Sequence, residues 1–119
     1  MNKKILVVDD DIDIVEPISL LLEGEGYAIE STTKGEQTYK KVEEYKPDLI
    51  LLDILMSGND GRTICKTLKS NMETKDIPVI MMSAHPGAEK DVKECKANDF
   101  IAKPFEIEDL LHTIHKNLN

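Results

Sequence analysis

Short, wholly apolar runs recur along this chain, and each leads into a stretch whose apolar residues fall at helical spacing. The clearest runs cover residues 5–8, 49–52 and 78–82. A run without polar alternation is typical of a strand that is buried on both faces. Strands that alternate with helices form a parallel sheet with helices on both of its faces. The pattern therefore predicts a doubly wound α/β fold.

Ten elements are expected along the chain: strands at 5–8, 27–32, 49–52, 78–82 and 100–102, and helices at 12–23, 35–45, 62–70, 87–96 and 106–118. One residue conflicts with this pattern. Pro17 lies inside the first helix, where a proline removes a backbone hydrogen bond. A capping box formed by Asp13 and Glu16 would begin the helix later. We therefore expect a distorted or delayed helix start.

Length and hydropathy restrict the class of protein. The 119 residues are enough for one domain, and 40% hydrophobic residues are enough for one packed core. No apolar run approaches the roughly 18 residues that cross a bilayer. The apolar run behind Lys3 and Lys4 is too short for a signal peptide. We therefore expect a cytoplasmic protein that does not bind a membrane.

Charge and cysteine content exclude further classes. The net charge of -8 argues against nucleic-acid binding by this domain. The spacing of Cys65 and Cys95 fits no zinc or redox motif. We expect two reduced thiols that pack as small hydrophobic groups.

Polar residues follow four of the expected strands. Asp9 and Asp10 follow the first strand, Asp53 the third, Ser83 the fourth and Lys103 the fifth. In a parallel sheet the carboxyl ends of all strands lie at one edge, where ligands bind. The fold should therefore gather carboxylates, a hydroxyl and an ammonium in one place.

Several carboxylates at close range repel one another, and a divalent cation removes that conflict. Hard oxygen ligands suit Mg2+, which often shares its shell with a phosphate. A carboxylate can also act as a nucleophile toward phosphorus and form an aspartyl-phosphate. An aspartate after a strand is often only a helix N-cap, and this interpretation stays open for Asp11 and Asp13.

These residues stand in motifs that resemble response regulator receiver domains of two-component signalling. The resemblance runs through the whole chain, 1–119, which we expect to be a single receiver domain with no output domain. It implies a flavodoxin-like, five-stranded parallel sheet with strand order 2-1-3-4-5 and five helices. The motifs that carry it are residues 5–11, 47–53, 56–61, 82–84 and 99–105.

The resemblance also implies a role for each matching residue. Asp53 matches the phosphoacceptor, which takes its phosphoryl group from the phosphohistidine of a sensor histidine kinase or a histidine phosphotransfer protein. Asp9, Asp10, Asp53 and the backbone carbonyl of Leu55 match the Mg2+ ligands. Ser83 and Lys103 match the hydroxyl and the ammonium that contact the phosphoryl group.

Three further features belong to the same resemblance. Phe100 matches an aromatic switch that follows Ser83 and remodels the surface of residues 87–118, where a downstream protein partner would bind. Leu55 and His85 match two positions that tune the lifetime of the phosphoryl group. The Lys103–Pro104 bond is expected to be cis. Such a domain catalyses only its own phosphorylation and dephosphorylation, and is not an enzyme with a separate substrate.

The sequence departs from the family at three positions. Ser57 stands where the family usually has proline, and the Gly58 that follows it makes this loop more flexible. The hydroxyl is Ser83 rather than the commoner threonine, with the same donor chemistry. Lys96 stands where a glycine is frequent, so the end of that helix can differ.

Two other interpretations compete with a receiver. Residues 11–15 match the D-x-D-x-[TV] pattern of haloacid-dehalogenase-type phosphatases, which also form an aspartyl-phosphate. That match starts two residues after the strand end, and a second acidic pair is missing. A calcium-binding loop at 9–13 lacks the central glycine and the terminal glutamate.

Overall fold

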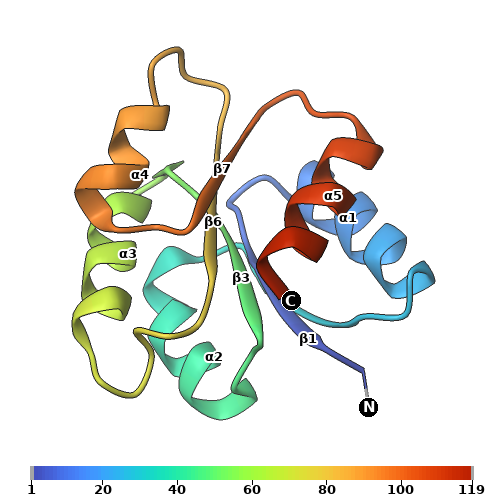
Figure 1. The fold of residues 1–119 in the computed structure, drawn as a ribbon, viewed down its shortest axis with the longest axis horizontal. Coiled ribbons are helices and arrows are strands. Elements are labelled where there is room, and N and C mark those ends of the chain that lie inside the picture. Colours follow the sequence, from blue (N-terminus) through green and yellow to red (C-terminus); the bar gives the residue numbers. More distant parts are fainter. Residues whose placement is uncertain (1, 119) are drawn as a thin grey trace.

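The computed structural model describes residues 2–118 and contains a five-stranded parallel sheet in the order β2-β1-β3-β6-β7 (Figure 1). Its strands are β1 (Lys4–Val8), β2 (Ala28–Thr32), β3 (Leu49–Asp53), β6 (Val79–Ser83) and β7 (Asp99–Ala102). Counted along the chain without the two short strands β4 and β5, this is the expected order 2-1-3-4-5. The predicted fold class is therefore confirmed.

Five helices cover the sheet: α1 (Ile12–Gly24), α2 (Thr38–Tyr45), α3 (Gly61–Ser70), α4 (Glu89–Cys95) and α5 (Ile107–Leu118). In Figure 1 the sheet is seen nearly edge-on, with α1 and α5 on one side and α2, α3 and α4 on the other. The helix expected at 35–45 begins with a short 3-10 turn, η1 (Gly35–Gln37). Within residues 2–118, no helix is both long enough and apolar enough to span a bilayer.

Alternate residues of the central strands contribute to two separate hydrophobic clusters. Leu6 and Leu52 pack with the side chains of α2, α3 and α4, whereas Val7 and Leu51 pack with those of α1 and α5. All four residues are wholly buried. The apolar runs therefore reflect a sheet that is covered on both faces. Cys65 and Cys95 are buried free thiols in the first cluster, as predicted.

The predicted delay in the first helix is wrong. Asp11, not Asp13, is the N-cap: its side chain accepts a hydrogen bond from the Asp13 N–H at 3.0 Å, and the helix begins at Ile12. This cap fixes the first turn, so Pro17 lies inside the helix. Asp13 and Pro17 are both exposed, so water can hydrogen-bond to the Asp13 carbonyl, which lacks its usual partner at Pro17.

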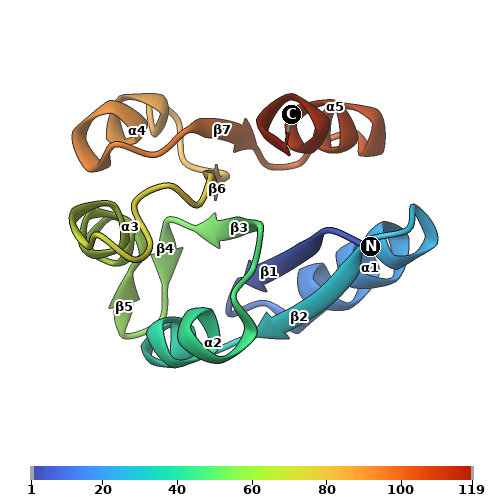
Figure 2. The ribbon, with the colours of Figure 1, turned by 60° about the horizontal axis from the view of Figure 1, so that its bottom comes forward.

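A short antiparallel hairpin follows the end of β3 and was not predicted. Its strands are β4 (Leu55–Met56) and β5 (Asn59–Asp60), and Figure 2 shows it beside α2 and α3. Gly61 then starts α3 in close contact with β3: its N–H donates to the Ile54 carbonyl at 2.7 Å. A Cβ at Gly61 would lie 2.1 Å from the backbone oxygen of Asp53, so only glycine fits here.

The strand order reverses at β1, because the chain adds β2 on one side of β1 and β3 on the other. In doubly wound sheets the crevice at such a switch point, outside the carboxyl ends of the strands, is where ligands bind. Asp9 and Asp10 follow β1, and Asp53 is the last residue of β3. The fold therefore places these carboxylates at the switch point.

Candidate functional site

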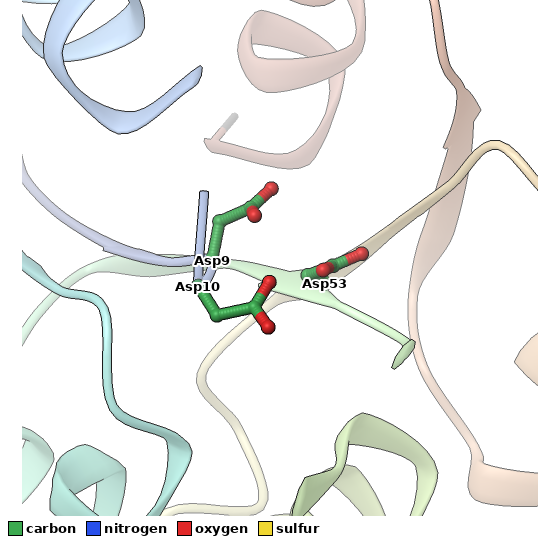
Figure 3. Close-up of side chains that lie close together, drawn as sticks. All are labelled: Asp9, Asp10 and Asp53. Atoms are coloured by element: carbon green, nitrogen blue, oxygen red, sulfur yellow. The ribbon is translucent and has the colours of Figure 1, made fainter. Parts of the chain in front are cut away.

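Three aspartates meet at the carboxyl edge of β1 and β3. Val8 pairs with Leu52 in the sheet, so the residues that come next, Asp9 after β1 and Asp53 at the end of β3, lie side by side. One carboxylate oxygen from each of Asp9, Asp10 and Asp53 lies within 4.8 Å of the others. Figure 3 shows the three side chains close together, with the carboxylate of Asp10 turned toward Asp53. The sequence predicted this meeting.

Lys103 brings the positive charge that was expected at this edge, but it pairs mainly with Asp9. Its ammonium lies 2.6 Å from Asp9 Oδ2 and 3.4 Å from Asp53 Oδ1. Asp9 is wholly buried, and its other oxygen accepts a hydrogen bond from the Asp11 N–H at 3.0 Å. The Lys103–Pro104 bond is cis, as the resemblance implied.

The charges at the site do not balance. Burial of Asp53, and then the nearby charge of Asp9, raise the pKa of Asp53 to about 6, although Lys103 acts in the opposite direction. Burial would lower the pKa of Lys103, but its hydrogen bond to Asp9 and the charges of Asp9 and Asp53 raise it. With three carboxylates and one ammonium, the site has excess negative charge and favours a cation.

The donor set matches a hard divalent cation. Carboxylate oxygens are the protein ligands that Mg2+ prefers, and Mg2+ needs only a few of them because it keeps several waters. Asp9, Asp10 and Asp53 supply such oxygens at a spacing that one ion can bridge. Asp10 is the exposed member, and its Oδ2 accepts a hydrogen bond from the Ser57 N–H at 2.7 Å.

A cavity of about 330 Å3 opens beside Asp53, and its lining includes Leu55, Ser83, His85 and Lys103. Ser83 ends β6, is buried, and its hydroxyl oxygen accepts a hydrogen bond from the His85 N–H at 2.9 Å. Asp53 therefore lines the same cavity as Ser83 and Lys103, which are expected to contact a phosphoryl group. Leu55 and His85, which are expected to tune its lifetime, line this cavity too.

Phe100 lies outside this cavity. It is half-buried on β7 and packs against the cluster under α2, α3 and α4. A larger hollow of about 950 Å3 lies between α2 and the segment after α3, and its lining includes Tyr39, Lys46 and Glu73. None of the site residues lines it. Its two carboxylates, Glu43 and Glu73, belong to no group within residues 2–118 that could hold a metal ion.

Residues 5–115 match the family model described as the response regulator receiver domain. The chain belongs to this family. A receiver domain is the phosphoacceptor module of two-component signalling, so the family resemblance seen in the motifs is confirmed. The relatives offer no support for the phosphatase alternative, and the aspartate that would be its nucleophile, Asp11, caps α1.

Curated relatives include longer proteins. The chain is 33% identical over 120 residues to the DNA-binding response regulator MtrA of Mycolicibacterium paratuberculosis, a match that covers 99% of this chain and 52% of MtrA. It is 40% identical over 107 residues to the alkaline phosphatase synthesis transcriptional regulatory protein PhoP of Bacillus subtilis, covering 88% of this chain and 44% of PhoP. The chain thus spans about half the length of these relatives.

Solved structures show the same receiver fold. A putative response regulator from Chloroflexus aurantiacus superposes with a TM-score of 0.94 at 32% identity, covering 99% of this chain and 98% of that one. The chemotaxis protein CheY4 of Vibrio cholerae gives a TM-score of 0.92 at 28% identity, covering 99% of this chain and all of CheY4.

One hydrogen bond at the site, from the Ser57 N–H to Asp10, was not predicted from the sequence. Ser57 was noted only as a departure from the family's proline. Its N–H reaches Asp10, 47 residues away in sequence. The sequence indicated only that serine, unlike proline, has a backbone N–H that can donate. No local sequence pattern indicates that Asp10 is its acceptor.

Proposed function

We propose that Asp53 accepts a phosphoryl group from the phosphohistidine of a sensor histidine kinase or a histidine phosphotransfer protein. The observation that carries this proposal is the placement of Asp53. Asp53 lines a cavity and belongs to a group of three aspartates that could hold a cation, and its carboxylate lies 3.4 Å from the Lys103 ammonium. An Asp53 oxygen attacks phosphorus, the bond from phosphorus to the histidine nitrogen breaks, and the imidazole leaves.

Asp9, Asp10, Asp53 and the Leu55 carbonyl would hold Mg2+, which when bound neutralises charge on the transferring phosphoryl group. The nucleophile has to be ionised, and with a pKa of about 6 Asp53 is mostly ionised at pH 7. Lys103 can pair with a phosphoryl oxygen while it stays close to Asp9. The Ser83 hydroxyl can rotate and donate a hydrogen bond to another phosphoryl oxygen.

Phosphorylation would change the surface formed by α4, β7 and α5, where a downstream protein would bind. β6 and β7 are paired from Ile80 and Asp99 up to Ser83 and Ala102, and the Lys103 N–H donates to the Ser83 carbonyl at 2.9 Å. A movement of Ser83 toward the phosphoryl group therefore acts on β7, which carries Phe100. The hydrogen bond from Ser83 and the ion pair from Lys103 to the phosphoryl group would exist only in the phosphorylated state. This difference between the two states would drive the switch.

The lifetime of the phosphoryl group would depend on Leu55 and His85. Leu55 is 54% exposed and lines the cavity beside Asp53. Hydrolysis requires a water in line with the departing carboxylate, and an apolar side chain offers no hydrogen bond to hold that water. A side chain can exclude this water by its size alone, whereas a side chain that holds the water for attack must place a polar group correctly. We therefore expect Leu55 to slow autodephosphorylation, with His85 in the lesser role.

The domain would work as a signalling switch in the cytoplasm and not as an enzyme with a separate substrate. The Cys65 thiol lies 3.4 Å from the Cys95 carbonyl, and burial raises the pKa of Cys65. Two neighbouring thiols that remain free suit a reducing compartment. The net charge of -8 argues against nucleic-acid binding by this domain.

The first prediction tests the acceptor. Asp53→Asn should abolish labelling by acetyl phosphate in the presence of Mg2+, because the amide cannot act as the nucleophile. Asp11→Asn is the matched control: it changes an exposed aspartate at the same edge, keeps the helix cap, and should label like the parent. Undiminished labelling of Asp53→Asn would rule out this residue as the acceptor.

The second prediction tests the switch. Beryllofluoride, a mimic of the phosphoryl group, should shift backbone amide NMR signals throughout residues 87–118, because Ser83 and β7 transmit the change. In Ser83→Ala, which lacks the hydroxyl, the shifts should remain near Asp53. If the parent also shows shifts only in the loops around Asp53, the proposed coupling is wrong.

The third prediction concerns lifetime. Leu55→Asn should speed the loss of the phosphoryl group from Asp53, because the amide can hold a water near phosphorus. Leu20→Asn makes the same substitution at an exposed leucine of α1 that does not line the cavity, and it should decay at the parent rate. Decay of Leu55→Asn at or below the parent rate would show that Leu55 does not exclude the water.

A further inference from the structure

Asp10 differs from the other two carboxylates in how it is held. Asp9 and Asp53 are buried and lie beside Lys103, whereas Asp10 is exposed. Among the described residues, its side chain accepts a hydrogen bond only from the Ser57 N–H, at 2.7 Å. Repulsion from Asp9 and Asp53 favours turning the Asp10 carboxylate outward to solvent. The Ser57 amide is the group that opposes this movement.

The turn that carries Ser57 leaves its amide free to donate. Ser57 and Gly58 connect β4 and β5, with Met56 paired to Asn59. Gly58 has a φ of 76°, and among the described non-glycine residues φ is positive only at Lys46 and Lys96, so φ is negative at Ser57. This combination fits a type II turn, in which the residue at the first central position gives no hydrogen bond to the hairpin.

The fold, and not Asp10, sets the position of this turn. The Asn59 side-chain amide donates to Glu36 at 2.9 Å, which ties the hairpin to η1. Asp60 accepts from the Arg62 N–H at 2.9 Å, and the Gly61 N–H donates to the carbonyl of Ile54, the residue after β3, at 2.7 Å. These bonds tie the hairpin to α3 and to the end of β3. The Ser57 amide is thus presented to Asp10 by a hairpin that is anchored on both sides.

We propose that the backbone N–H of Ser57 is a positioning group for the cation site. It holds Oδ2 of Asp10 and leaves the other oxygen available as a ligand. The inference rests on the proposed function, because that function requires the cation. Partners that hydrogen-bond a ligating carboxylate orient it and strengthen metal binding. A proline at this position could not make the contact, because it has no N–H.

The test compares two substitutions at Ser57. Ser57→Pro removes the N–H, and its fixed φ suits the first central position of a type II turn, so the hairpin should persist. Ser57→Ala removes only the hydroxyl and keeps the amide. Ser57→Pro should bind Mg2+ roughly 10- to 100-fold more weakly than the parent, whereas Ser57→Ala should match the parent. Binding is measured by NMR titration with Mg2+ alone, beside thermal unfolding without metal, which should be similar in all three proteins.

A second readout needs no metal and no variant of the turn. In the metal-free protein, Asp10→Ala should speed hydrogen exchange of the Ser57 amide and shift its proton signal, because the amide loses its acceptor. Exchange at the Ser57 amide that is unchanged by Asp10→Ala would overturn the inference.

The outcomes separate this inference from the proposed function. Ser57→Pro with parental Mg2+ affinity overturns the positioning role and leaves the proposed function intact. Equal weakening by Ser57→Ala assigns the effect to the hydroxyl and also overturns the role of the amide. A parent protein that does not bind Mg2+ contradicts the proposed function itself, and the inference falls with it.

Discussion

The ion pair between Asp9 and Lys103, 2.6 Å apart and largely buried, organises the edge of the sheet at which the site lies. It joins the end of β1 to the loop after β7, 94 residues apart in sequence. A buried charge without a partner destabilises a fold strongly. The same ammonium lies close to Asp53, yet a single positive charge cannot balance three carboxylates. The remaining negative charge favours the binding of a cation, as the proposed function requires.

This excess charge opposes folding while no cation is bound. A carboxyl whose pKa is raised from its ordinary value to about 6 destabilises the folded protein by on the order of 3 kcal/mol once it is ionised. The cost is full above pH 6 and disappears as the pH falls toward the ordinary value, because the proton then neutralises Asp53. In the proposed function, cation binding and phosphoryl transfer would both act on this excess negative charge.

The sequence predicted the fold class and the meeting of Asp9, Asp10 and Asp53, because both depend on apolar runs and on residues at strand ends. The strand order was expected only from the family resemblance. Prediction from the sequence failed where the local sequence fitted two structures, where an element was too short to show a pattern, and where a contact between distant segments decided the outcome. The start of α1 depended on whether Asp11 or Asp13 would cap it, and both residues had suitable side chains. The β4–β5 hairpin has strands of two residues, too short to show alternation. The partner of the Ser57 amide depends on where that hairpin lies.

Charge pairing was also only partly predictable. The residue types indicated that Lys103 would lie near the carboxylates, but they could not show that Asp9 is its closer partner. That preference depends on side-chain geometry: Asp9 is wholly buried beside Lys103, whereas Asp10 faces solvent and the Ser57 amide. The roles of Leu55 and His85 remain predictions, supported by their shared place at the cavity beside Asp53.

The most direct test of this account is the titration of the Asp53 side chain, followed by the NMR signal of its carboxyl carbon with and without Mg2+. In the metal-free protein the apparent pKa should lie near 6. With saturating Mg2+ it should fall, because a cation among the three carboxylates favours the ionised form. A metal-free pKa at the ordinary aspartate value, or a pKa that Mg2+ does not move, would contradict the account.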